Sequence, residues 1–512
     1  MLKPCRSWLQ EHERSALGAL ISFYLVIVVA QGSLKLLWTD ELFTFYISQQ
    51  PGLGGVWRAL AAGADPNPPL MHVLVKGSTA LLGGSALAMR LPASLCVLLA
   101  IVAMWWMLRR WVPPVFAMAG VLAFMATRGF DYAYDARSYA PMIGFAMVSL
   151  ALWMAASDLA GWRRGMALAG MAIALTLGIS SNYYCVLAFF PIAIGELVAR
   201  RWRPGVWLAM TVASLPLIAY LPLIRHDIGE FGPYAWNRTQ ISVLTLSYFE
   251  LVEGIFWPVL GLGLWAIWKA RTQSDTERTD VSPNTAEMAA VGVLLVYPFL
   301  GFAIAVSKAG MISPRCVAPV CCGFGMALGL LGQRMFRESG RAGMALVFGL
   351  VFWVGFRESV CAGVLWRQRE AFLTLVSAVE SVPANRVLVG DSGFMLPFFF
   401  YANGNARQRV VFPVDFQAIH RYEREDSGEQ NLWAGGKPIF PFPVITLDAA
   451  LSGSPQIVVV GRPHGWLAES MRLRGFNLQL TGDSADWSHV GGIFSPMARP
   501  ASRIMVATRA GR

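Results

Sequence analysis

Residues 16–37 read ALGALISFYLVIVVAQGSLKLL, an apolar run of 22 positions. A helix needs about 20 apolar residues to cross a bilayer, so this run predicts a membrane-spanning helix. The basic residues Lys3, Arg6 and Arg14 precede it. The run is longer than the apolar core of a signal peptide and has no clear cleavage site, so we expect it to remain in the protein as an anchor.

Ten further apolar runs follow this one. The composition of the whole chain agrees with a bilayer environment, because 55% of its 512 residues are hydrophobic and only 14% are charged, against about 25% charged in soluble domains. The sequence therefore predicts a polytopic α-helical membrane protein with about eleven transmembrane helices. We expect these helices near 16–37, 90–108, 113–129, 138–157, 165–181, 183–199, 206–224, 249–268, 288–307, 315–333 and 342–363.

Basic residues alternate between the loops of this arrangement. Cytoplasmic loops are enriched in Lys and Arg, so the N-terminus is expected in the cytoplasm and the segment after the eleventh span outside. The same rule explains the net charge of +11 without a nucleic-acid partner. The basic set comprises Lys3, Arg6, Arg14, Arg109, Arg110, Arg163, Arg164, Arg200, Arg201, Arg203, Lys269, Arg271, Arg278, Arg334, Arg337 and Arg341.

The C-terminal segment has the pattern of a soluble α/β domain. Apolar runs at 386–391, 456–461 and 476–480 predict strands, and 464–475 predicts a helix between the last two. No GxGxxG motif accompanies the strands, so no dinucleotide site is expected. We expect a frayed end over the last dozen residues. The predicted domains are thus 1–364, a transmembrane region, and 365–512, an extracytoplasmic α/β domain.

The first outer loop, about 38–89, contains two adjacent carboxylates, Asp40 and Glu41, directly after the first span. A carboxylate at a membrane boundary is costly to desolvate and can serve as a general base. The alternative is a simple hydrophilic end to the helix. Further along the loop, the apolar stretch 70–82 is too short to span comfortably and predicts a re-entrant or interfacial helix.

The next outer connector reads DYAYDARSYAP from Asp131 to Pro141. Pro141 suits a first helical turn, so Arg137 is expected near a helix N-terminus, where the peptide dipoles favour anions. Arg315 supplies a second cation at the outer end of a late span, and arginine is well suited to bind phosphate. The alternatives are an Arg–Asp pair that only ties the connector together, and interfacial snorkelling of Arg315.

Several further residues are weaker candidates for the site. Arg90 opens the second span and Tyr183 follows Asn182, and either can be structural. His72 lies in the short apolar stretch, where packing is the simpler explanation. Six His residues and seven Cys residues show no zinc-site or disulfide spacing. Binding of a divalent cation by the carboxylates of Asp40, Glu41 and Asp135 remains an open alternative.

In their order along the chain, these motifs resemble those of the C-type glycosyltransferases. The shared features are Asp-Glu after span one, a Pro-Pro-Leu loop, Arg-Leu-Pro opening span two, Asp-Ala-Arg-Ser-Tyr-Ala before span four, and a late Arg-x-x-x-Pro. More narrowly, residues 16–330 are similar to the protein O-mannosyltransferase and lipid A aminoarabinose transferase group, whose members use polyprenyl- or dolichyl-phosphate sugars.

The resemblance implies roles for individual residues. Asp40 would be the base and Glu41 would support it. Arg137 and Arg315 would hold the donor phosphate, while Asp135 would orient Arg137. Tyr139, Arg90 and Tyr183 would line the pocket. The sequence departs from the usual family pattern at Asn67, at Asn182 and at Cys316, where the family often has His, His and an aromatic residue.

The expected activity is inverting transfer of a sugar from polyprenyl phosphate to a lipid, glycan or protein acceptor on the outer face of a membrane. We expect this membrane to be the bacterial inner membrane. A transporter or flippase of lipid-linked saccharides would share the spans and the charges, but the chain shows no inverted repeat. A polysaccharide polymerase or ligase is a further alternative.

Overall fold

The computed structural model describes residues 13–200, 202–231, 234–235, 237–272, 285–336, 340–383, 386–423, 425–452, 456–481 and 503–509. Lys3, Arg6, Arg201, Arg278, Arg337 and most of the connector 270–287 lie outside these residues. The chain forms two compact units. The first, called the helical unit, comprises Met1–Gly32, Arg90–Leu221 and Thr239–Ser359, and the second, called the mixed unit, comprises Ser33–Met89, Pro222–Arg238 and Val360–Arg512.

Each of the eleven predicted spans coincides with a helical segment in the described residues. Seven segments have the length and composition to cross a membrane, and an eighth is a pair bent by 62°. Three more are shorter apolar helices. The polytopic helical fold is therefore confirmed, while the number eleven stays a prediction.

The seven long segments are α2 (Glu13–Leu34), α6 (Ala86–Arg109), α9 (Tyr139–Asp158), α10 (Gly161–Ser181), α12–α13 (Pro204–Ser214 and Pro216–Phe231), α14–α15 (Ser242–Val252 and Phe256–Thr272) and α19 (Gly340–Ser381). The bent pair is α16 and α17 (Thr285–Leu295 and Tyr297–Ile304), and the shorter helices are α7 (Pro114–Met125), η2–α11 (Tyr183–Ala188 and Phe189–Ala199) and α18 (Val320–Phe336). Short turns complete the unit: α8 (Arg128–Asp131), η1 (Tyr132–Tyr134), η4 (Glu253–Ile255), η6 (Ala305–Ala309) and η7 (Pro314–Val317).

Small residues allow α7 and α18 to pack with their backbones close together. A Cβ added to Gly325 would lie 2.7 Å from the carbonyl oxygen of Gly120, and one added to Gly329 would lie 2.8 Å from that of Phe116. Such contacts are typical of helix pairs in membranes, where close backbone approach replaces the hydrophobic driving force. This contact joins two short helices that are about 200 residues apart in sequence.

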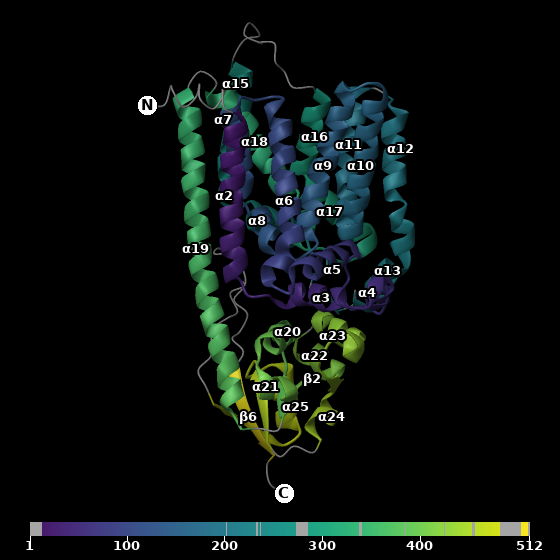
Figure 1. Cartoon of the computed structure of the whole chain (residues 1–512), viewed down its shortest axis with the longest axis vertical. Helices are drawn as coiled ribbons and strands as arrows, with labels where there is room; N and C mark the ends of the chain where they lie inside the picture. Colours follow the sequence, from purple (N-terminus) through teal and green to yellow (C-terminus); the bar gives the residue numbers. More distant parts are fainter. Residues whose placement is uncertain are drawn as a thin grey trace. The chain divides into compact units, whose positions relative to one another are not determined.

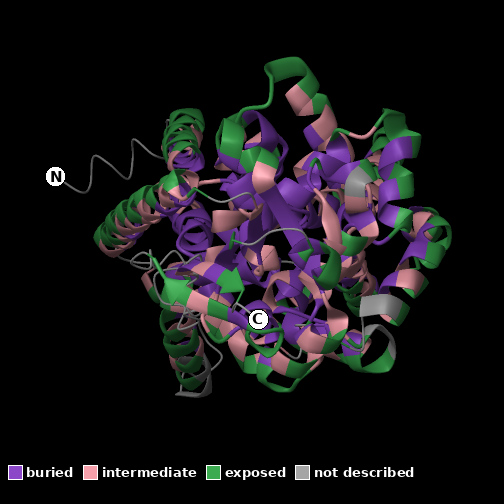
Figure 2. Ribbon diagram, turned by 90° about the horizontal axis from the view of Figure 1, so that it is seen from below, coloured by how far each residue is buried: buried purple, intermediate pink, exposed green. Residues whose placement is uncertain are grey.

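Helices α9, α10 and α12 lie side by side in the helical unit, with α11 against α16 (Figure 1). A buried polar contact ties three of them together: the Trp153 indole on α9 donates to Glu196 on α11 over 2.7 Å, and Arg203, just before α12, donates its Nε to the same carboxylate over 3.0 Å. Figure 2 distinguishes buried from exposed residues. Exposed ones include large apolar side chains such as Val26, Ile218 and Phe352, as expected for helices that face lipid.

The mixed unit begins with three short helices in the first loop: α3 (Thr39–Ser48), α4 (Gly52–Ala61) and α5 (Leu70–Leu82). A helix at 70–82 is therefore confirmed, whereas its position at the membrane surface stays a prediction. Lys76 on α5 donates to the carbonyl oxygens of Ser48 and Gln50 at the end of α3, over 3.0 and 2.8 Å. These bonds satisfy carbonyls that a helix end leaves without a partner.

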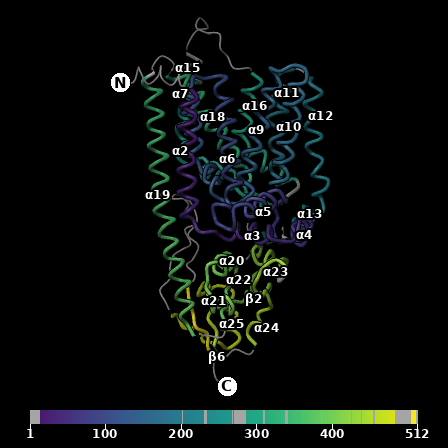
Figure 3. The backbone as a smooth tube through the Cα atoms, in the orientation of Figure 1, coloured from purple at the N-terminus to yellow at the C-terminus, as the bar shows by residue number. Residues whose placement is uncertain are grey.

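The C-terminal part of the mixed unit, green to yellow in Figure 3, is an α/β fold around a six-stranded sheet of order β3-β2-β1-β4-β6-β5. Neighbouring strands from β3 to β4 are parallel, whereas β6 is antiparallel to both β4 and β5. The strands are β1 (Arg386–Val389), β2 (Val410–Val414), β3 (Val444–Thr446), β4 (Gln456–Gly461), β5 (Phe476–Leu480) and β6 (Arg503–Arg509). The helices are α20 (Ser392–Tyr401), α21 (Gly404–Arg409), α22 (Phe416–Tyr422), α23 (Ser427–Ile439), α24 (Leu447–Leu451) and α25 (Trp466–Leu473).

The predicted strands at 386–391, 456–461 and 476–480 and the helix between the last two are confirmed. The expected frayed end was wrong, because Arg503–Arg509 forms β6 between β4 and β5. Ile504, Met505 and Ala507 are buried in this strand. The apolar side chains of β6 pack beside those of both β4 and β5. This pairing outweighs the polar character that Arg503 and Arg509 give to the terminus.

The strand order reverses between β1 and β4, where open α/β sheets commonly bind ligands beyond the carboxyl ends of their strands. Here protein groups occupy that position. The Trp466 indole donates to the carbonyl of Gly390 over 2.8 Å, and Glu423 accepts from the backbone N–H of Trp466 over 3.2 Å. A carboxylate thus lies at the N-terminus of α25, where a phosphate lies in nucleotide-binding folds.

Candidate functional site

The two carboxylates after the first span have different environments. Both lie in the first turn of α3, but Glu41 is completely buried whereas Asp40 is partly exposed. The Glu41 side chain accepts the backbone N–H of Trp38, the N-cap residue, over 3.4 Å and so satisfies a donor at the start of the helix. Glu41 is therefore engaged in holding the start of the helix, and Asp40 is the more exposed of the two carboxylates.

The start of α3 is fixed by the α/β part of its own unit. The hydroxyl of Thr39 donates to the carbonyl of Gly393 at the start of α20, and the backbone N–H of Leu37 donates to the hydroxyl of Tyr401 over 2.8 Å. The Phe43 and Phe440 rings pack edge to face with centroids 5.5 Å apart. Asp40 thus projects from a helix that the C-terminal part of the chain holds in place.

The connector before α9 brings Asp135 and Arg137 together in the helical unit. Both are buried, and the backbone N–H of Arg137 donates to the carbonyl of Asp135 over 2.7 Å. Helix α9 begins at Tyr139 with Pro141 in its first turn, as expected. Arg137 therefore directly precedes a helix N-terminus, which adds favourable dipoles for an anion to the charge of its guanidinium.

Arg315 lies in the same neighbourhood of the helical unit. It belongs to η7, and its guanidinium carbon is 5.6 Å from the centroid of the Tyr139 ring. Tyr132 packs against Tyr139 with ring centroids 5.1 Å apart. Burial raises the pKa of Tyr132, and the nearby charges of Arg128 and Arg315 act in the opposite direction. Arg128, which sequence analysis did not select, is thus a further cation beside the predicted site.

Asn182 and Tyr183 connect the end of α10 to this connector. The Asn182 amide donates to the Ser138 hydroxyl over 3.1 Å, and its oxygen accepts the backbone N–H of Tyr184 over 3.0 Å. The Tyr183 ring packs against Tyr220, with centroids 6.2 Å apart. Asn182 therefore anchors Ser138, the residue directly after Arg137.

Arg90 is fully buried and has a structural contact. Its guanidinium donates to the carbonyl of Gly32 on α2 over 2.7 Å. This bond ties α6 to α2 within the helical unit. A pocket role for Arg90 stays a prediction, and the bond to Gly32 favours the structural alternative.

Asp65 was missed by sequence analysis and organises the loop before α5. It is buried and accepts from the backbone N–H of Asn67 over 3.0 Å and from its side-chain amide over 2.5 Å. The Nε2 of His72 lies 3.5 Å from Asp65. The signal was present in the sequence, because Asp two residues before Asn within a Pro-rich stretch is typical of a side-chain-stabilised turn.

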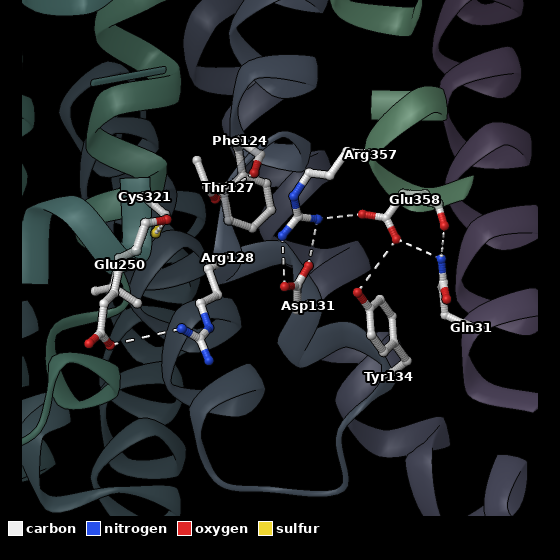
Figure 4. Close-up of polar contacts among 11 residues, drawn as sticks. Gln31, Phe124, Thr127, Arg128, Asp131, Tyr134, Glu250, Cys321, Arg357 and Glu358 are labelled. Carbon is white, nitrogen blue, oxygen red and sulfur yellow. Dashed lines mark hydrogen bonds and ion pairs between the residues drawn. The ribbon is translucent and has the colours of Figure 1, made fainter. Parts of the chain in front are cut away.

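A second missed group is the buried cluster around Arg357 and Glu358 on α19 (Figure 4). Arg357 forms two bonds with Asp131 in the connector before α9, and Glu358 accepts from Gln31 on α2. Adjacent opposite charges inside an apolar span were a signal that sequence analysis did not use. Within the described part of the chain, no three His, Cys, Asp or Glu side chains gather in a geometry suited to a metal ion.

Comparisons with known proteins bear on this arrangement. Residues 66–225 match the family model described as dolichyl-phosphate-mannose-protein mannosyltransferase. The apo crystal structure of ArnT from Cupriavidus metallidurans matches at 16% identity and a TM-score of 0.62, over 97% of this chain and 100% of that one. The structure of the same ArnT bound to undecaprenyl phosphate matches at 16% identity and a TM-score of 0.58, over 97% of this chain and 99% of that one. Among curated proteins, none matches.

These matches confirm the predicted resemblance and the predicted fold. The chain has the fold of a membrane glycosyltransferase of the C type, and its matched segment resembles enzymes of the mannosyltransferase class. The predicted enzyme class, a glycosyltransferase, is thereby confirmed. The matched segment begins at the loop before α5 and includes the connector with Asp135 and Arg137.

Proposed function

We propose that this protein transfers a sugar from a polyprenyl-phosphate donor to a hydroxyl or amine acceptor on the non-cytoplasmic face of a membrane, with inversion at the anomeric carbon. Two comparisons support the donor class: the family model names a dolichyl-phosphate sugar, and a structure of the same fold was determined with undecaprenyl phosphate. The proposed location is the bacterial inner membrane, and the acceptor is a lipid, glycan or protein.

One observation carries the proposal: the clustering of cations beside the N-terminus of α9. Arg315 lies over Tyr139, the first residue of α9, and Arg137 is two residues before it. A departing lipid phosphate gains negative charge as the bond to the sugar breaks. Cations and helix dipoles placed in advance at such a charge commonly provide the largest part of catalysis. In this proposal Arg137 and Arg315 bind the phosphate.

Asp40 is the proposed general base. It is the more accessible member of the carboxylate pair, since Glu41 is buried in its capping contact. In a single displacement, Asp40 takes the proton of the acceptor as the acceptor oxygen or nitrogen bonds to the anomeric carbon, and the lipid phosphate departs with the bonding electrons. Glu41 supports Asp40 by fixing the first turn of α3. Asp135 and Tyr139 shape the surroundings of the two arginines.

A transfer assay tests the proposal. Purified protein is incubated with a panel of radiolabelled polyprenyl-phosphate sugars and a membrane extract as the acceptor pool. We expect label to move to an acceptor, and Asp40→Asn to lower the rate by at least about 100-fold, since general bases contribute roughly 10²–10⁴-fold. Asp158→Asn is the matched control, because it changes an exposed carboxylate at the other end of α9, paired with Arg110.

Two results would contradict the proposal in different ways. Asp40→Asn with the activity of wild type would overturn the base assignment alone. If no label leaves the carrier for any sugar, while the labelled carrier crosses proteoliposome membranes, the flippase alternative replaces the transferase.

A further inference from the structure

A buried polar cluster links α19 and α2 to the connector that carries the proposed phosphate site. All its members belong to the helical unit, and Figure 4 shows them converging from three segments. The Arg357 guanidinium donates to both oxygens of Asp131, over 2.8 and 2.7 Å, and also to Glu358. Arg357 and Glu358 are 5% and 4% exposed.

The second carboxylate oxygen of Glu358 extends the cluster. It accepts from the Gln31 amide over 3.0 Å and from the Tyr134 hydroxyl over 3.5 Å. The Gln31 amide also donates to the backbone carbonyl of Glu358 over 2.7 Å. Arg357 is thus held from one side by its neighbour on α19, and the connector is contacted twice, at Asp131 and at Tyr134.

The energetic cost of this arrangement indicates that it has a role beyond stability. Charged groups inside a span are expensive to insert, and a buried ion pair is commonly no more stabilising than apolar residues of the same volume. A planar guanidinium that grips both oxygens of a carboxylate instead fixes orientation. The Arg357–Asp131 pair is therefore expected to fix the orientation of the connector to which Asp131 belongs.

The connector that it grips is not a regular element. It consists of one turn of α-helix, one 3-10 turn and an irregular stretch of bends and turns before α9. Two further anchors hold it: the Ser94 hydroxyl on α6 donates to the carbonyl of Ala133 over 2.8 Å, and Asn182 donates to Ser138 over 3.1 Å. Arg137 lies between these anchors, so its position depends on how firmly both ends are held.

We propose that Arg357 is a positioning residue for the donor-phosphate site: by gripping Asp131, it holds the connector so that Arg137 is ready to meet the phosphate. This inference rests on the proposed function. Arg357 acts through Asp131 and the connector backbone, while Glu358 and Gln31 keep the guanidinium in place.

The test compares two arginine–carboxylate pairs in the same unit, each with one buried member. Arg357→Lys keeps the charge but loses the planar two-bond grip on Asp131. Arg203→Lys is the matched control, since Arg203 makes the same kind of contact with buried Glu196 among α9, α11 and α12. Both variants are measured as full-length protein for thermal unfolding, for binding of undecaprenyl phosphate, for kcat and KM, and for hydrogen exchange of residues 128–138.

We expect both variants to unfold at lower temperature, but only Arg357→Lys to lose function. In that variant kcat falls by between about 10- and 100-fold, because misplacement by about 1 Å can cost that much. Undecaprenyl phosphate binds more weakly, and exchange of 128–138 becomes faster. Asp131→Asn is expected to reproduce this pattern to a smaller degree.

Each contrary result has a distinct meaning. If Arg357→Lys keeps the kcat and carrier affinity of wild type, or loses them only as much as Arg203→Lys does, the positioning role is overturned. If wild type neither binds nor transfers the carrier, the proposed function fails. Hydrogen exchange then tests only whether the Arg357–Asp131 contact holds the connector. Unchanged protection of residues 128–138 in Arg357→Lys would show that it does not.

Discussion

Adjacent residues of one type can have different roles, and Asp40 and Glu41 illustrate this at the scale of single residues. A helix turns by about 100° per residue, so the two carboxylates at the start of α3 face different surroundings. Glu41 is buried in its capping contact, whereas Asp40 keeps access to solvent. The pair could be found in the sequence, but which member is accessible depends on the packing of α3.

Glu429 gives the α/β part of the mixed unit a testable dependence on pH. Burial raises the pKa of Glu429 to about 7 from its ordinary value near 4.5. Between about pH 4.5 and 7 the folded protein therefore keeps a proton that the unfolded chain has lost, so stability falls as the pH rises through this window and stays low above it. Glu429→Gln removes this dependence.

We expect the thermal midpoint of Glu429→Gln to match that of wild type at pH 5 and to exceed it by a few degrees at pH 8. Differential scanning fluorimetry across this range measures the effect. Glu370→Gln, which changes an exposed carboxylate on α19, is the control. Parallel curves for wild type and Glu429→Gln would show that the titration of Glu429 does not contribute.

The sequence revealed the candidate residues that stand in recognisable motifs and missed those that act through distant partners. Asp40, Arg137 and Arg315 follow from their places beside predicted spans. Arg357 was missed because its partner, Asp131, is 226 positions away in the chain. Nothing local to α19 indicates that this arginine contacts the connector before α9.

At the scale of elements, the contact between α7 and α18 depends on glycine. A side chain at Gly325 meets the backbone of Gly120, which cannot move away as a flexible side chain could. We expect Gly325→Val to separate the helices and lower the thermal midpoint by several degrees, or to prevent accumulation of folded protein. Size-exclusion chromatography after heating measures both outcomes.

Gly349→Ala is the matched control, because Gly349 also lies in an apolar helix but a Cβ added there has no neighbour within 4 Å. Alanine favours helix over glycine by about 1 kcal/mol, so this variant should be as stable as wild type or slightly more stable. Equal effects of both substitutions would mean that the close contact is not important for stability.

Element prediction succeeded where a pattern is local and failed where it depends on neighbours. The apolar runs locate the helices, and the strands β1, β4 and β5 follow from short apolar stretches. Strands β2, β3 and β6 were missed, and β6 lies between β4 and β5, a pairing that leaves no local signal in the sequence. The three shorter helices coincide with predicted spans, although length alone does not classify them as such.

At the scale of the whole chain, the first loop and the C-terminal region belong to one compact unit. The Asn431 amide on α23 donates to the carbonyl of Gly63 over 2.8 Å, across 368 positions of sequence. Sequence analysis treated these regions as separate domains. Contacts of this separation leave no periodic signal, so only the three-dimensional structure reveals the association.

The predicted topology can be tested on the intact protein. Alkaline phosphatase is active only outside the cytoplasm, so we expect it to be active when fused to the C-terminus and inactive when inserted into the connector 273–284. Green fluorescent protein at the same sites should give the opposite pattern. Active phosphatase in the connector would reverse the predicted orientation and with it the proposed outer location of Asp40.

The tight contact of α7 with α18 also has a consequence for how the protein is made. Helix α7 has only 12 residues, fewer than the ~20 that a stable span needs, and its partner is synthesised about 200 residues later. At ~5–20 residues per second, the ribosome needs roughly 10–40 s to produce α18. During that interval α7 lacks the helix that covers its glycine face, so we expect biogenesis to be most sensitive to insertase depletion at this stage.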